Sequence, residues 1–128
     1  MAGEVLLDTN IVIAFFGLET AVCERVAESD IIVSSTVLGE LYYGARKSGQ
    51  TASNLTRLDE FSASVAVLPC DSATARYYGE IKDRLRAKGR PIPDNDIWVA
   101  AVALQYGLPL ATRDEHFKHV ESLLLKNW

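Results

Sequence analysis

The chain has 128 residues, a length typical of one domain whose hydrophobic core needs no disulfide or structural metal to stay folded. Hydrophobic residues make up 48% of it and charged residues 23%, values that exclude a disordered or fibrous protein. The net charge of −4 argues against the broad basic surface of a protein that coats nucleic acid. It is compatible with a nuclease whose carboxylates bind metal, because bound cations reverse the local charge.

The cysteines and the N-terminal residues indicate the cellular compartment in which the protein is expected. The two cysteines are far apart and have no His or Cys neighbour at metal-site spacing, so neither a zinc site nor a disulfide framework is indicated. The chain starts without a basic leader, and its early apolar run at 11–16 is too short for a signal peptide or a membrane span. We expect one domain over residues 1–128, in a reducing cytoplasm and outside the membrane.

The first half of the chain alternates short apolar strands with helices. Strands are expected at the apolar runs 4–7, 31–33 and 65–68. Helices are expected at residues 11–16, 20–29, 35–49 and 52–62. Asp8 follows the first strand directly, and Glu40 lies at the edge of the apolar face of the third helix, about one turn past the second strand. Both acids are therefore placed near the carboxyl ends of strands.

The second half continues this alternation. Helices are expected at residues 72–88 and 94–106, and strands at residues 108–111 and 122–126. Asp71 is the predicted N-cap of the longer helix. In the next helix, residues 97–104 carry no charged or amide side chain, so this helix should be buried on every side. Asp96 stands at its front, and Asp114 follows the fourth strand.

Strands that alternate with helices predict a parallel sheet with right-handed crossovers and helices on both faces. The expected fold class is α/β, a three-layer α/β/α arrangement around a central parallel sheet of four to five strands. Ligands of such sheets bind outside the carboxyl ends of the strands. We expect four acids at this edge: Asp8, Glu40, Asp96 and Asp114.

Carboxylates gathered at one edge repel one another, and a cation relieves that repulsion. Oxygen ligands without a partnering His or Cys favour hard cations, so Mg²⁺ or Mn²⁺ is expected rather than zinc. Such an ion activates water for attack on a phosphodiester. The chain offers no Ser-His-Asp order, Cys-His pair or Walker-type phosphate loop as a competing chemistry. Each acid alone also fits a helix cap or a solvated residue, and their shared position is what favours a site.

Asp94 and Asp96 cannot both face one site if both are helical, because side chains two positions apart on a helix point about 200° from each other. Asp94 follows Pro93 and is interpreted as the N-cap or as a group just outside the ligand set. Asp96 is interpreted as the metal ligand. Thr112 and Asn10 are expected to support the site by hydrogen bonding a carboxylate or a metal-bound water.

Two further groups of side chains, a basic run and two histidines, lie outside the acidic set. A basic run ends the long helix, and its members Arg84, Arg86 and Lys88 can grip RNA phosphates or simply form a solvated helix face. His116 and His119 stand in a polar segment and are expected at the surface.

Four motifs in order along the chain resemble those of the PIN-domain ribonucleases. They are Asp8-Thr9-Asn10-Ile11, Glu40-Leu41-Tyr42-Tyr43-Gly44, Asp96-Ile97-Trp98-Val99-Ala100-Ala101 and Thr112-Arg113-Asp114. More narrowly, the chain resembles the VapC-type toxins of prokaryotic toxin–antitoxin pairs. The resemblance spans nearly the whole chain.

This resemblance implies a PIN-like fold and an acidic quartet that binds Mg²⁺ or Mn²⁺, made of Asp8, Glu40, Asp96 and Asp114, with Thr112 as a supporting hydroxyl. It implies cleavage of single-stranded RNA by metal-activated water, which leaves a 5′-phosphate and a 3′-hydroxyl. It also implies a homodimer held inactive by a VapB-type antitoxin, whose tail fills a groove and reaches the acids.

Two other functions fit the same predicted sheet less well. A catalytically inactive PIN-like module that binds RNA or protein would keep the fold without turnover. A phosphoacceptor signalling domain would need a pair of acids after the first strand and a Lys after a late strand. Here Asp8 stands alone, and Arg113 is the nearby cation. The sequence therefore favours the nuclease.

Overall fold

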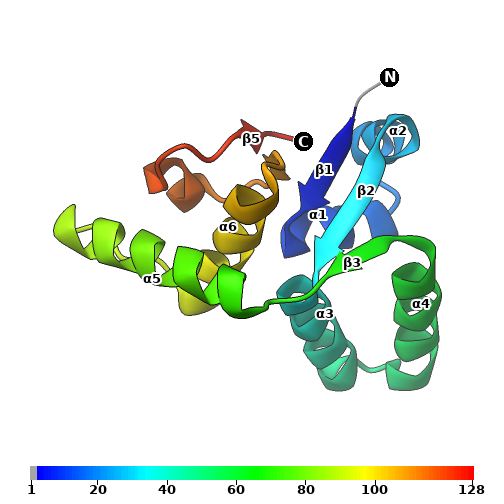
Figure 1. The fold of residues 1–128 in the computed structure, drawn as a ribbon. Helices are drawn as coiled ribbons and strands as arrows, with labels where there is room; N and C mark the ends of the chain where they lie inside the picture. Colours follow the sequence, from blue (N-terminus) through cyan, green and yellow to red (C-terminus); the bar gives the residue numbers. More distant parts are fainter. Residues whose placement is uncertain (1–2) are drawn as a thin grey trace.

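The computed structural model describes residues 3–128, and its centre is a parallel sheet of five strands in the order β3-β2-β1-β4-β5 (Figure 1). The strands are β1 (Glu4–Leu7), β2 (Asp30–Ser34), β3 (Ala66–Leu68), β4 (Leu110–Ala111) and β5 (Leu125–Lys126). The helices are α1 (Thr9–Phe16), α2 (Thr20–Glu28), α3 (Ser35–Lys47), α4 (Thr51–Ser64), α5 (Ser72–Ala87), α6 (Asp94–Tyr106) and the 3₁₀ turn η1 (Glu115–His119). The predicted alternation of strands and helices is confirmed.

Helices cover both faces of the sheet. Figure 1 shows α1 and α2 behind β1 and β2, whereas α6 lies on the other side with α5 packed against it. The packed pair α3 and α4 extends beyond the carboxyl end of β2 and returns the chain to β3 (Figure 1). The expected three-layer α/β/α arrangement is therefore confirmed.

The position of β1 at the middle of the sheet decides where the site forms. β1 pairs in parallel with β2 on one side, where Val5 is opposite Ile31, and with β4 on the other, where Leu6 is opposite Leu110. The chain thus runs outward to β3 and then returns across β1 to β4 and β5. Such a reversal of strand order leaves a crevice at the carboxyl ends of the two strands that flank it.

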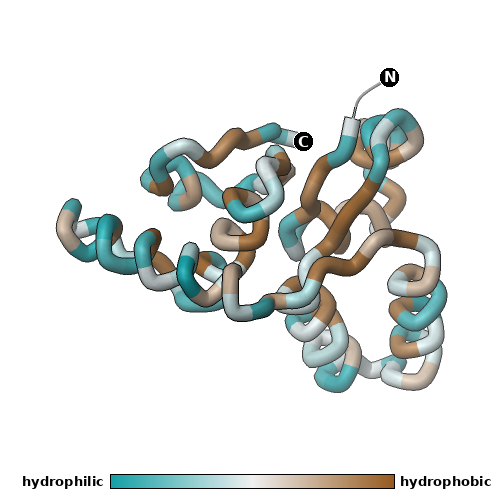
Figure 2. Tube along the Cα trace, viewed as in Figure 1, coloured by the Kyte–Doolittle hydropathy of each residue, from teal (hydrophilic) through white to brown (hydrophobic). Residues whose placement is uncertain are grey.

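The core is formed by the central strands and the helix α6, together with the inward-facing apolar residues of the surrounding helices. Figure 2 shows hydrophobic residues along β1 and β2 and a mixed pattern along α5. Within α6, Val99, Ala100 and Val102 are fully buried, as the uniformly apolar run predicted. Phe117 of η1 is also completely buried. No helix of the described residues is long and apolar enough to cross a membrane.

Two helix starts follow from local side-chain chemistry. The hydroxyl of Ser34 accepts a hydrogen bond from the backbone N–H of Val37 at 3.2 Å and caps α3. The carboxylate of Asp71 accepts from the backbone N–H of Thr74 at 3.0 Å, and the Thr74 hydroxyl accepts from the backbone N–H of Asp71 at 3.0 Å. This reciprocal pair is a capping box. It confirms Asp71 as the cap of α5.

Replacing Phe117 tests how firmly η1 is anchored. Phe117→Ala should lower the free energy of unfolding by about 3–5 kcal/mol, because it removes a fully buried ring and leaves a cavity. Leu124→Ala is the control, since Leu124 is 65% exposed and should change stability by roughly 0.5 kcal/mol or less. Urea unfolding of both variants gives the comparison, and equal stabilities would show that Phe117 does not anchor the fold.

Candidate metal centre

Asp8 is the most buried acid of the predicted quartet. It follows β1, has only 2% of its surface exposed, and accepts hydrogen bonds from the hydroxyl of Thr112 at 2.7 Å and from the backbone N–H of Thr9 at 2.9 Å. Its own backbone N–H donates to the carbonyl of Ala111 at 3.0 Å, which extends the pairing of β1 with β4. These hydrogen bonds therefore fix Asp8 at the carboxyl end of β1, beside the crevice where the strand order reverses.

Thr112 and Thr9 connect Asp8 to two other acids. The Thr112 hydroxyl, which donates to Asp8, accepts a hydrogen bond from the backbone N–H of Asp114 at 3.1 Å. The hydroxyl of Thr9 donates to Oε1 of Glu40 at 3.1 Å and thereby joins α1 to α3. Thr112 makes a hydrogen bond to a carboxylate, as expected, while its supporting role in a metal site stays a prediction. The sequence predicted no contact for Thr9.

Asp96 and Asp114 meet the imidazole of His116. Ligand atoms of these three side chains lie within 4.8 Å of one another. Nε2 of His116 is 2.7 Å from Oδ2 of Asp96, whose side chain is 14% exposed. Asp114 is exposed at the mouth of the cluster. His116 is partly exposed, as expected for a surface residue, with 34% of its side chain accessible. Its Nε2, however, is shielded from solvent and faces Asp96, a contact that was not predicted.

The acids experience one another's charges, so they share one electrostatic environment. The pKa of Asp8 is raised from 3.8 to about 6, mainly by burial; the hydrogen bonds from Thr112 and Thr9 oppose this rise, and the charges of Asp96 and Asp114 add to it. Burial is also the main cause that raises the pKa of Glu40, with added repulsion from Asp96 and Asp114.

The pKa of Asp96 is raised as well, mainly by burial, while the charge of His116 and its contact with the carboxylate oppose that rise. A cluster of three acids whose pKa values are all raised is characteristic of functional sites. Oxygen donors with one imidazole nitrogen nearby suit a divalent cation, which would restore the ionised form of each carboxylate.

The structure separates Asp94 from Asp96, but not by the predicted capping arrangement. Pro93 occupies the N-cap position of α6, and Asp94 is already the first helical residue. Its Oδ1 accepts from the hydroxyl of Tyr78 and from Nζ of Lys82, both at 3.0 Å. The prediction that Asp94 caps the helix is wrong because the packing of α5 on α6 offers its carboxylate a cation and a hydroxyl instead. Asp94 points to α5.

Asn10 was expected to hydrogen bond either a carboxylate or a metal-bound water. In the structure its side chain bonds to a backbone N–H instead of a carboxylate. Its Oδ1 accepts from the backbone N–H of Arg113 at 3.4 Å and so links α1 to the segment after β4. The guanidinium of Arg113 turns away from the acids and pairs with Glu19 at 2.9 Å.

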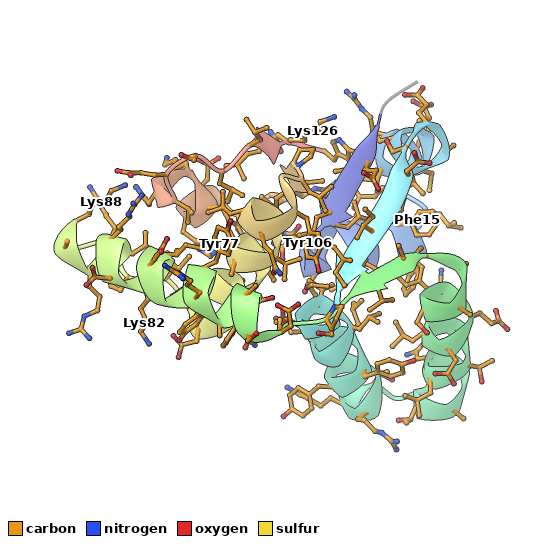
Figure 3. The ribbon with its side chains drawn as sticks, in the orientation of Figure 1. Phe15, Tyr77, Lys82, Lys88, Tyr106 and Lys126 are labelled. Atoms are coloured by element: carbon orange, nitrogen blue, oxygen red, sulfur yellow. The ribbon has the colours of Figure 1, made fainter. Side chains whose placement is uncertain are left out.

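The basic run lies on α5, on the outer side of α6. Arg84 and Lys88 both pair with Glu121, at 3.2 and 3.7 Å, whereas Arg86 is exposed in the last turn of the helix. Figure 3 shows Lys82 and Lys88 extending from different sides of α5. Contact of Arg84, Arg86 and Lys88 with RNA stays a prediction.

Comparison with known proteins agrees with this geometry. The PIN-domain family matches residues 5–123. The chain belongs to the PIN-domain family. Ribonuclease VapC2 of Haemophilus influenzae is 35% identical over 127 residues, and the alignment covers 96% of each chain. The tRNA(fMet)-specific endonuclease VapC of Shigella flexneri is also 35% identical, with 96% of each chain covered. The predicted resemblance to PIN-domain ribonucleases of the VapC type is confirmed.

Solved structures of toxin–antitoxin complexes share the fold. The VapBC2 structure from Rickettsia felis, bound to a promoter DNA fragment, contains a chain that superposes with a TM-score of 0.90 at 30% identity and covers 100% of this chain and 99% of its own. The DNA-bound VapBC structure from Salmonella typhimurium gives a TM-score of 0.91 at 29% identity, with coverage of 100% and 99%. The predicted PIN-like fold is therefore confirmed.

The raised pKa of Asp8 makes a prediction about stability without metal. A carboxyl whose folded pKa exceeds its unfolded value stabilises the fold below the unfolded pKa and loses this contribution as the pH rises through the folded pKa. For Asp8 the loss lies between about pH 4 and 6. Asp8→Asn should therefore stabilise the metal-free protein at pH 7, by on the order of 2 kcal/mol.

Chemical unfolding in EDTA at pH 7 measures this effect. Asp94→Asn is the control, because Lys82 and Tyr78 hold the pKa of Asp94 below its usual range and its neutralisation should bring no gain. A destabilised Asp8→Asn variant would contradict the assigned cost of the buried charge.

Proposed function

We propose that this protein is a Mg²⁺- or Mn²⁺-dependent endoribonuclease toxin, inhibited by a VapB-type antitoxin. The observation that carries this proposal is the convergence of acids from four separate segments on one edge of the sheet, within a chain of the PIN-domain family. The proposed ligand set is Asp8, Glu40, Asp96 and Asp114. We further propose a homodimer that acts on RNA in the cytoplasm as a single PIN domain over residues 1–128.

The residues of the site have distinct tasks in this proposal. A bound divalent cation supplies an activated water and neutralises charge on the phosphodiester oxygens. Asp8 is oriented by Thr112 and Glu40 by Thr9, so neither carboxylate has to be immobilised when the cation enters. The buried body of α6 fixes Asp96 in the same way. Asp114 is the most exposed of the four acids, so we expect it to be the first that an arriving substrate meets.

An inactive module that binds RNA or protein is the alternative. Such a module has no need to maintain buried carboxylates whose ionisation is unfavourable, as it is for Asp8, Glu40 and Asp96. This unfavourable arrangement favours a site that takes up a cation and turns over substrate.

Cleavage of RNA by the purified chain tests the proposed function. Wild-type protein should produce fragments with 5′-phosphate ends in Mg²⁺ or Mn²⁺ and none in EDTA. Asp96→Asn should lower the rate by at least about a hundredfold, because a charged ligand of the cation is lost. Asp94→Asn is the matched control two residues away and should keep most activity, since its carboxylate contacts α5. Cleavage in EDTA, or a larger loss for Asp94→Asn, would refute the assignment.

An apolar groove next to the acids is the proposed antitoxin site. This groove, of about 340 Å³, lies between α1, α3 and α4 and is lined by Ile13, Phe16, Leu41 and Leu58. Its wall also includes Glu40 and Thr9, so an occupant that follows the groove arrives at the acids. Ile13 is 58% exposed there, which leaves a large apolar surface open to a partner.

A charge placed in the groove should weaken inhibition. Ile13→Asp should lower the affinity for the cognate antitoxin about tenfold or more, because the new carboxylate loses its water when the apolar partner segment binds. Leu124→Asp is the control, as Leu124 is 65% exposed and is not part of the groove lining. Calorimetric titration of each variant with the antitoxin encoded beside the toxin gives the affinities. Equal affinities would place the antitoxin elsewhere.

A further inference from the structure

The imidazole of His116 belongs geometrically to the cation site, although sequence reasoning kept it apart. One ligand atom from each of Asp96, Asp114 and His116 lies within 4.8 Å of the others. Bonds of about 2.1 Å around an octahedral ion place adjacent ligands ~3 Å apart and opposite ligands ~4.2 Å apart. The 2.7 Å between Nε2 of His116 and Oδ2 of Asp96 is slightly shorter than this spacing, and the 4.8 Å limit of the cluster is slightly longer. Small side-chain shifts therefore bring the three groups to the distances of ligands that share one ion.

The nitrogen that faces the carboxylate has no other partner among the described residues. Nε2 of His116 is shielded from solvent and makes no well-aligned hydrogen bond, although it lies 2.7 Å from Oδ2 of Asp96. The two atoms are thus in close contact without the alignment of a hydrogen bond. When the imidazole is neutral with its proton on Nδ1, Nε2 carries a lone pair, and a cation bound by Asp96 can accept it once the two atoms move slightly apart.

The segment that carries the ring is held rigidly. Phe117 is completely buried, and its ring centroid lies 5.1 Å from that of His116. At the other end of η1, the backbone N–H of Asp114 donates to Thr112, the residue that also orients Asp8. His116 is thus tied to the same framework as the acids, so its position does not depend on a mobile loop.

We propose that His116 is a nitrogen ligand of the cation site and that it biases this site towards Mn²⁺ over Mg²⁺. The inference rests on the proposed metal-dependent function and deepens it. Mg²⁺ prefers oxygen ligands and parts with its waters reluctantly, whereas imidazole is a good ligand for divalent transition metals. A site with one nitrogen among its oxygens still accepts Mg²⁺ but holds Mn²⁺ more tightly.

Metal binding to the full chain tests this role without relying on activity. Metal-free wild type, His116→Gln and His119→Gln are titrated with Mn²⁺, and free Mn²⁺ is followed by electron paramagnetic resonance; Mg²⁺ affinity comes from competition. His116→Gln replaces the nitrogen with an amide oxygen, so Mn²⁺ affinity should fall about tenfold and Mg²⁺ affinity by less than about threefold. His119→Gln, on the same turn, should match wild type in both.

The nitrogen also has a direct spectroscopic signature. Bound Mn²⁺ should show hyperfine coupling to a directly coordinated ¹⁴N in wild type and in His119→Gln, and none in His116→Gln. Absence of that coupling in wild type, or equal losses of Mn²⁺ and Mg²⁺ affinity in His116→Gln, would overturn the inference. If RNA is cleaved with metal while the ¹⁴N coupling is absent, only the role of His116 fails. If wild type binds neither metal, the proposed function fails with it.

Discussion

The arrangement of the site depends on one costly feature, the buried carboxylate of Asp8 at the end of the central strand. Burial alone makes its ionised form unfavourable, and the neighbouring charges of Asp96 and Asp114 add to that cost. The hydroxyl of Thr112 and the backbone N–H of Thr9 offset it only in part. The metal-free protein is therefore less stable than it would be without this carboxylate, but its cation site is already formed. Such a loss of stability is common where function requires it.

Topology explains how distant parts of the chain supply this site. Because β1 lies between β2 and β4, the segments that follow these three strands emerge side by side at one edge. Asp8 follows β1, Asp114 follows β4, and Glu40 stands in the helix that follows β2. The hydrogen bonds made by Thr9 and Thr112 run between these segments. The strand order thus sets the approximate positions of the acids, and two threonines refine them.

Sequence patterns predicted what depends on chain order and missed what depends on side-chain packing. The strands, the buried helix and the shared edge of the acids follow from hydrophobic periodicity and the rules of parallel sheets. Capping preference is local and predicts Asp94 as a cap, whereas its actual partners lie on another helix, at Tyr78 and Lys82. His116 has polar neighbours in sequence, which correctly predict partial exposure but give no sign of its contact with Asp96. One signal was available, since Phe117 beside it is a large apolar residue that needs a core position.

Helix α6 raises the question of what fixes its rotation, because a helix that is buried on nearly every side has no apolar face to align it. Polar side chains near its two ends supply the answer. Asp94 bonds to Lys82 at the first turn, and Gln105 donates to Asp71 at 3.1 Å in the last turn. Both partners belong to the α5 region, so the two contacts act together against rotation. A rotation of one residue, about 100°, would carry Asp96 out of the cluster. The two end contacts together therefore keep Asp96 directed at the sheet edge, and Asp94→Asn retains the side-chain oxygen that accepts from Tyr78 and Lys82.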